Sequence, residues 1–306
     1  MAILEKRRAL GFGACALASS LWGCGFFFGK LALAEMGFAH MVLYRFLFAI
    51  VVLLPLLVTH RPRLNRREWG LLLVASFLGV PLQFLIQFYA LSITTVSHAA
   101  LMVGTMPVIL AVGAAAFAHE RMDWVGWAAL AGSTCGAALI ALGGGLHVKG
   151  GATLVGDALV VVSLMIALFW ILFNKQLMER HSHVVVTAYG LALGTAMLMI
   201  WVPVRYGFPP VAGISVKAWL ALAASGVLCT ATTTLLWNWG MTQVPASQAG
   251  VLLNMEPLIG SLLGVLVLGE RLGPSAWVGG GLILASAITL TTRSKTRVRA
   301  DLVVSS

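Results

Sequence analysis

Charged residues are scarce in this sequence, and their scarcity excludes a water-soluble protein. Only 10% of the 306 residues are charged, whereas 60% are hydrophobic, and the mean hydropathy is +0.96. A soluble globular domain carries about 25% charged residues, because its surface must be hydrated. We therefore expect lipid, rather than water, around most of this chain.

Cysteine is also rare, and nothing in the chain resembles a catalytic or metal site. The sequence has no Walker-type phosphate loop, so we expect that ATP does not drive it directly. His181 and His183 have a poor spacing for a metal, and no nucleophile–base pair stands out. We expect no catalytic residue, no metal and no cofactor. Four cysteines lie inside apolar runs, where we expect buried thiols: Cys15, Cys24, Cys135 and Cys229.

Acidic residues are few, which leaves a strongly basic chain. Ten Asp and Glu stand against 20 Lys and Arg, for a net charge of +10. A basic balance can indicate nucleic-acid binding, but here the basic residues cluster beside the apolar runs. Membrane topology explains that placement better. We expect the lipid bilayer, and no nucleic acid, as the partner of these charges.

Long apolar runs separated by short polar turns make up most of the chain. A helix of about 20 apolar residues crosses the hydrocarbon layer. The runs are continuous rather than alternating, which favours helices over a barrel. The sequence predicts an all-α integral membrane protein with ten transmembrane helices, at about 10–34, 38–58, 69–90, 98–117, 124–142, 156–177, 184–202, 219–241, 247–268 and 275–291.

An internal repeat divides the chain into two halves. The stretch 97–127 reappears, without gaps, at 247–277, and seven of its 31 positions are identical. Pro107 aligns with Pro257 at this offset of 150, and Lys30 aligns with Lys175 at an offset of 145. We predict two repeats of five helices, at 1–150 and 151–306, joined at the glycine-rich stretch 143–151. The second repeat ends in a basic cytoplasmic tail.

The odd number of helices in each half predicts that the halves enter the membrane in opposite orientations. The distribution of basic residues indicates that both termini are cytoplasmic, in a bacterial inner membrane. An inverted-topology repeat is the architecture of many secondary transporters, whose substrate sites lie near the midplane. The residues predicted to be cytoplasmic are Lys6, Arg7, Arg8, Arg61, Arg63, Arg66, Arg67, Arg121, Lys175, Arg180, Arg293, Lys295, Arg297 and Arg299.

Several motifs resemble one transporter family. MEPLIGSLLGVLVLGERL at 255–272 and TMPVILAVGAAAFAHERM at 105–122 are similar to the repeated signature of the drug/metabolite transporter superfamily, EamA type. LWG at 21–23 and YRFLFA at 44–49 also fit, although His119 stands where that family usually has glycine. The resemblance covers nearly the whole chain. It implies ten helices, two inverted halves and transport of small metabolites, often amino acids, and some similar members export aromatic amino acids.

Glu256 is the one acid placed deep inside a predicted span, where an ionised carboxylate is costly and is by default a functional candidate. It would bind a substrate amino group or carry a coupling proton; the alternative is a protonated or hydrogen-bonded acid with a structural role. Pro107 and Pro257 are predicted hinges, since each removes one backbone donor. The alternative for both prolines is a packing kink.

Polar and aromatic side chains form stripes on other predicted helices. Gln83 and Gln87 share one face, because residues four apart in a helix are neighbours. Such stripes either line a cavity or hold helices together. Arg45 either contacts carbonyls or binds a substrate carboxylate. The predicted substrate-binding residues are Trp22, Gln83, Gln87, Trp170, Asn238 and Glu256.

These patterns together predict a secondary transporter that works by alternating access. Its expected cargo is a small molecule, an amino acid or related metabolite, and export is favoured over uptake. A cationic drug or a sugar derivative is an alternative cargo. A passive facilitator, or a membrane-embedded enzyme acting on lipid-linked substrates, is an alternative function. The sequence leaves the oligomeric state open.

The inverted repeat can be tested by labelling. Cysteines introduced at 121 and 271, the equivalent arginines of the two halves, should react with a membrane-impermeant thiol reagent from opposite sides of the membrane. Labelling of both positions from one side would contradict the inverted arrangement.

Overall fold

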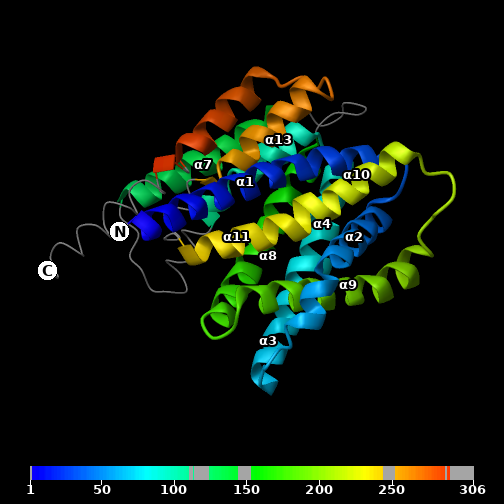
Figure 1. Ribbon diagram of the computed structural model, residues 1–306. Coiled ribbons are helices and arrows are strands. Elements are labelled where there is room, and N and C mark those ends of the chain that lie inside the picture. The colour runs from blue at the N-terminus through cyan, green and yellow to red at the C-terminus, as the bar shows by residue number, and fades with distance from the viewer. Residues whose placement is uncertain are drawn as a thin grey trace, which may run out of the picture.

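The structure is a computed structural model that describes residues 2–109, 113, 124–143, 153–243, 252–286 and 288–289 (Figure 1). These residues are almost entirely helical and contain no strand. The predicted joint after Gly143, the turn at 120–121, position 247 and the basic tail lie outside the described residues. The labelled elements are α1 Ala2–Leu33, α2 Phe38–Thr59, α3 Arg66–Phe77, η1 Leu78–Leu82, α4 Gln83–Ser92, α5 Val96–Val103, α7 Trp124–Gly143, α8 Leu154–Met178, α9 His183–Tyr206, α10 Val216–Gly226, η2 Val227–Thr232, α11 Thr233–Gln243 and α13 Met255–Leu266.

Within the described ranges, six continuous helices are long and apolar enough to cross a membrane. They match the first, second, third, sixth, seventh and eighth predicted spans, so the apolar runs located them correctly. Shorter apolar helices stand at the fourth, fifth and ninth, and residues 274–286 are helical at the tenth. The six long helices are Ala9–Leu33, Phe38–Thr59, Arg66–Ser92, Leu154–Met178, His183–Tyr206 and Val216–Gln243.

Two of the shorter helices are interrupted beside the prolines that the repeat aligns. The helix that contains α5 breaks at 104–105, two residues before Pro107. A second break at 253–254 precedes α13, which has Pro257 in its first turn. Proline is tolerated there, because the first residues of a helix have no intrahelical acceptor for their N–H groups. The prolines therefore begin new helical segments instead of kinking continuous helices.

Two of the long helices contain a short π-helical segment. η1 joins α3 to α4 and contains Pro81, and η2 joins α10 to α11. The offset of 150 places residues 78–82 on 228–232, so the two irregular segments fall at equivalent positions of the repeat. Short π-helical turns are rare and are frequent at functional sites, since they shift the backbone hydrogen-bond register.

Helix α1 runs through the assembly beside α10, α11 and α13, as Figure 1 shows. On the other side, α8 packs against α3, η1 and α4, and α2 packs against α9. Small residues allow the closest approach. A Cβ added at Gly23 of α1 would lie 2.6 Å from the Glu256 carbonyl oxygen and 3.0 Å from the Gly260 nitrogen. The backbones of α1 and α13 therefore touch at this crossing.

Glycine 23 provides a test of this packing. Gly23→Ala should lower the free energy of unfolding by about 1–3 kcal/mol, because the new methyl group meets the backbone of α13 rather than a side chain that can move. Thermal unfolding of the purified chain measures the effect. Gly13→Ala in the same helix is the matched control, since a Cβ there meets nothing within 4 Å and should be neutral or stabilising. Equal losses in both variants would contradict the tight crossing.

Candidate functional site

Arg45 of α2 lies in the interior of the bundle and is only 3% exposed. Its Nε donates a hydrogen bond to Thr230 Oγ1 at 2.7 Å, and its Nη2 donates to the Cys229 carbonyl at 3.0 Å. Both acceptors belong to η2, from the other half of the chain. The reading of Arg45 as a residue that contacts carbonyls is confirmed, although its partner is distant in sequence.

Aromatic rings and a glycine complete the surroundings of this guanidinium. Its Cζ lies 5.0 Å from the ring centroid of Phe84 and 5.1 Å from that of Phe88, both on α4. Rings in this position attract a cation through their negative faces. A Cβ at Gly25 of α1 would lie 3.5 Å from Nη2, so the missing side chain leaves space beside the charge. The arginine is thus held from four helices.

Glu256 places a carboxyl group in the same region, from the first turn of α13. The side chain is partly buried, and the Glu256 backbone meets α1 at Gly23, two residues before the Gly25 that adjoins the Arg45 guanidinium. No ion pair within 4.0 Å joins these two described residues. A carboxyl group and a guanidinium that are not paired with each other can together bind a molecule that carries both charges.

The predicted aromatic and amide residues lie on several helices, and two of them contact other side chains. Trp22 packs against Trp237, with ring centroids 5.3 Å apart. Asn238 donates to Thr187 Oγ1 at 2.6 Å, which ties α11 to α9. Trp22 and Trp237 therefore supply apolar area on α1 and α11, whereas Asn238 already has a protein partner.

The two glutamines of α4, which were predicted to share a face, are both buried. Gln83 is 7% exposed and Gln87 is 6% exposed. Oε1 of Gln83 has no hydrogen-bond partner in the described part of the chain, which leaves an acceptor available. Trp170 of α8 instead lies against Gly79 of η1, where a Cβ would overlap the indole ring. Its position is that of a packing residue at the boundary of the central region.

The helix breaks beside the two predicted hinges, Pro107 and Pro257, lie close together. A Cβ at Gly104, where the first helix breaks, would lie 3.6 Å from Cβ of Pro257. Pro107 is buried just beyond that break. The interruptions of the two halves therefore pack together.

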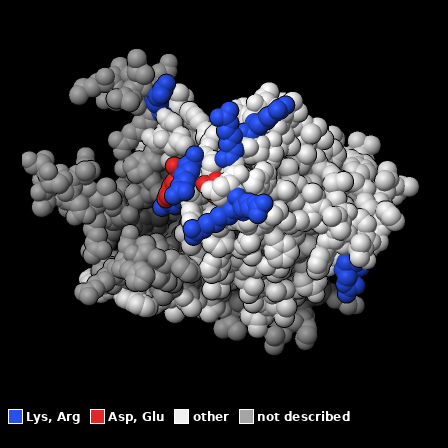
Figure 2. All heavy atoms as spheres, turned by 90° about the horizontal axis from the view of Figure 1, so that it is seen from below, with Lys and Arg blue, Asp and Glu red and all other residues white. Residues whose placement is uncertain are grey.

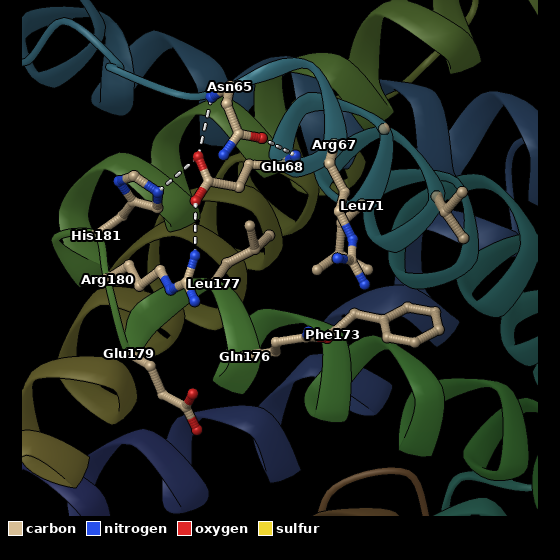
Figure 3. A pocket seen from close by; sticks show the side chains of 12 residues that line it. Asn65, Arg67, Glu68, Leu71, Phe173, Gln176, Leu177, Glu179, Arg180 and His181 are labelled. Carbon is tan, nitrogen blue, oxygen red and sulfur yellow. Dashed lines mark hydrogen bonds and ion pairs between the residues drawn. The ribbon is translucent and has the colours of Figure 1, made fainter.

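An open pocket of about 650 Å³ lies away from the predicted residues, between the start of α3 and the end of α8 (Figure 3). Glu68 is fixed there by the backbone N–H of Asn65 at 2.9 Å, by His181 at 3.1 Å and by Arg180 at 3.9 Å. Figure 2 shows Lys and Arg side chains gathered beside acidic ones on the face seen from below. None of the predicted substrate-binding residues lines this pocket.

A second acid is buried that the sequence patterns did not predict. Asp157, in the first turn of α8, is fully buried and contacts His98 and Thr94. Glu256 is therefore not the one acid held in the interior. A first-turn acid is common on exposed helices, so the hydrophobic pattern could not distinguish it. The nearby histidine in an otherwise apolar span was the available signal.

The anchoring of Arg45 can be tested through its acceptor. Thr230→Val keeps the shape of the side chain and removes the oxygen that receives the Nε–H bond. It should lower the free energy of unfolding by about 1.5–3 kcal/mol, the range for hydrogen bonds to charged groups. Thermal unfolding in detergent measures it. Thr242→Val, at an exposed hydroxyl, should cost less than about 0.5 kcal/mol, and an equal loss in both would contradict the assigned role.

Comparisons with known proteins agree with the architecture. The model of the EamA-like transporter family matches residues 9–142 and again 154–292. An uncharacterized transporter of Archaeoglobus fulgidus is 27% identical over 90% of this chain and 95% of its own. A protein of Streptantibioticus cattleyicolor named "Probable terminal-alkyne amino-acid exporter" is 28% identical over 66% of each chain. One solved crystal structure superimposes with a TM-score of 0.66 over 95% of this chain and 98% of that chain, at 18% identity, and so supports the fold.

Proposed function

This chain belongs to the EamA-like transporter family, and we propose that it is a secondary transporter of amino acids or related zwitterionic metabolites, working by alternating access between two inverted halves. The observation that carries the proposal is that Arg45 and Glu256 adjoin α1 two residues apart, at Gly25 and Gly23, and form no ion pair with each other. A guanidinium suits a substrate carboxylate, and a carboxylate suits a substrate amine.

The packing supports the inverted arrangement. α1 contacts α10, η2 and α11, and α8 contacts α3, η1 and α4. The offsets of the repeat align α1 with α8, α10 with α3, η2 with η1 and α11 with α4, so the two sets of contacts are equivalent. A two-fold relation between the halves explains these pairs of contacts, and the family's double match has the same division.

The basic face supports cytoplasmic termini. Arg67 near the start of α3 and Arg180 just after α8 line the same pocket, and both are exposed. The positive-inside pattern had assigned both residues to the cytoplasmic side. Their meeting on one face is expected if α2 and α8 both run towards the cytoplasm of a bacterial cell.

The surroundings of the charged pair support an amino acid with an apolar side chain. Phe84, Phe88 and the Trp22–Trp237 pair supply aromatic surface near the charges. Aromatic faces favour both apolar groups and amines. The printed name of the Streptantibioticus relative indicates an amino-acid exporter, which agrees with this substrate class and with export. The breaks beside Pro107 and Pro257 provide places where the halves can bend.

A counterflow assay tests this function. The purified chain in proteoliposomes should exchange a radiolabelled aromatic or aliphatic amino acid against the same unlabelled compound. Glu256→Gln should reduce this exchange about 10–100-fold, because a charged hydrogen bond to the substrate amine contributes about 1.5–3 kcal/mol. Glu35→Gln is the control, since Glu35 is exposed and bonded to Ser215, and it should exchange like the parent.

Two outcomes would overturn the assignment. Exchange of cationic drugs or sugar derivatives, with none of any amino acid, would replace the substrate class. Amino-acid exchange that is identical in Glu256→Gln and the parent would remove the acid from the binding site.

A further inference from the structure

A cluster of polar side chains is buried where α5 and α8 begin, and the proposed transport site does not use it. Asp157 is fully buried, and His98 is 5% exposed. His98 Nδ1 lies 2.9 Å from Asp157 Oδ2, and Thr94 Oγ1 donates to Asp157 Oδ1 at 2.6 Å. Both carboxylate oxygens are therefore occupied. Ionisable groups buried inside membrane spans are rare and frequently mark ion or proton pathways.

These contacts join the two halves of the chain. Thr94 and His98 belong to the first half, and Asp157 opens the second. A further bond runs in parallel, because Thr153 Oγ1 donates to the Ile93 carbonyl at 2.6 Å. The backbones are also close, since a Cβ at Gly156 would lie 3.2 Å from the Ala90 carbonyl oxygen. The junction is tight and depends on few side chains.

The junction lies at the end of the bundle opposite the basic face. It is at the beginning of α8, whereas Lys175 and Arg180 are at the end of that helix. A helix of 25 residues separates the two by about 37 Å. Val155, two residues from Asp157, is 61% exposed, so the buried pair lies within one helical turn of the surface.

Two more charges surround α5 at this end. Lys30 of α1 donates to the Leu91 carbonyl at 2.8 Å and to that of Thr94 at 2.5 Å. Glu270, after α13, accepts from the N–H groups of Val96 at 2.8 Å and Ser97 at 2.7 Å. Each is tied to the backbone next to the His98–Asp157 pair.

Other helices packed on α5 add no charge here. Neither α4 nor α7 has a charged residue between its ends. The other charged groups of α1 and α8 lie at the ends of those helices that are far from this junction. Glu256 is at the start of α13, which is the end of that helix distant from the junction. Among the charged groups of the described residues that are hydrogen-bonded at this junction, two carboxylates then face one ammonium when the imidazole is neutral, and Arg271, next to Glu270, is exposed. A protonated imidazole balances the cluster, and buried charges are stabilised when they are balanced.

We propose that His98 and Asp157 form a proton-binding site that holds the two halves together at this end of the bundle, and that loss of the imidazole proton releases them. Imidazole ordinarily changes charge between pH 5 and 8. The attraction is greatest while His98 is an imidazolium and Asp157 a carboxylate. It weakens as rising pH removes the proton and leaves a carboxylate in excess. Opening of this end is then linked to release of one proton.

The repeat does not provide a second copy of this site at the equivalent positions. At the offset of 145 Asp157 aligns with Phe12, and at the offset of 150 His98 aligns with Gln248. The opposite end therefore lacks an equivalent carboxylate–imidazole pair at these positions. Its role in coupling transport to protons rests on the alternating-access function proposed above, whereas proton-linked opening can be measured without any solute.

Distance measurements between spin labels test the proposal. Labels at Ser92→Cys and Val155→Cys, two exposed positions on either side of the junction, would be measured in the full chain in lipid nanodiscs. The ratio of the longer-distance to the shorter-distance population should grow about threefold or more from pH 5.5 to pH 8.5, and by no more than about tenfold per pH unit, which is the limit for one linked proton. The background would replace the native thiols Cys15, Cys24, Cys135 and Cys229.

Asp157→Asn and His98→Gln should abolish this pH response, because each removes one charge of the pair. Asp157→Asn keeps the shape and an acceptor for Thr94, so it separates charge from packing. His40→Gln is the control, since His40 is an imidazole outside the cluster bonded only to the Gly207 carbonyl, and it should respond like the parent.

Thr94→Val provides a second variant if the first two fail to fold, because it keeps both titrating groups and should keep a response with a changed midpoint. A parent distribution that is constant from pH 5.5 to 8.5 would overturn the proposal, and so would a response that persists in Asp157→Asn. Failure of every solute in the counterflow assay would leave this measurement unaffected, so the two hypotheses fail separately.

Discussion

Lipid offers no hydrogen-bond partner, so every irregularity in a membrane-embedded chain must be satisfied from within the protein. This constraint explains why the polar residues of this chain occur where helices are interrupted. Arg45 bonds to the carbonyl of Cys229 in a π-helical segment, Lys30 bonds to the last carbonyls of α4, and Glu270 covers the N–H groups that open α5. The few charges of the interior are thus placed by the backbone groups that helix breaks expose.

The long helices could be predicted from the sequence because one property determines them. A continuous apolar run of sufficient length has no other stable conformation in a bilayer, and six such helices were located correctly. The spacing of Gln83 and Gln87 predicted that they share one face, and both are buried. The sequence predicted a hinge or a kink at Pro107 and at Pro257, and the structure has a helix break beside each of these prolines.

The polar contacts could not be predicted, because they join residues that are far apart in the sequence. Arg45 and Thr230 are separated by 185 positions, and His98 and Asp157 by 59. Periodicity describes one helix at a time, and no pattern within a helix shows which neighbour it meets. The π-helical segments could not be predicted for a different reason. They arise from a shift in backbone hydrogen-bond register, which most side chains tolerate.

Equivalent positions of the two halves are filled in complementary ways. Trp170 rests on Gly79, whereas its counterpart Gly25 leaves room beside Cys229 for the guanidinium of Arg45, whose own counterpart is Gly190. A duplicated ancestor with identical halves would have presented the same chemical groups to both compartments. Under the inverted arrangement proposed here, divergence at a few such side chains is enough to make inside and outside chemically distinct. The direction of transport would then depend on those substitutions, because the fold itself is equivalent on the two sides of the membrane.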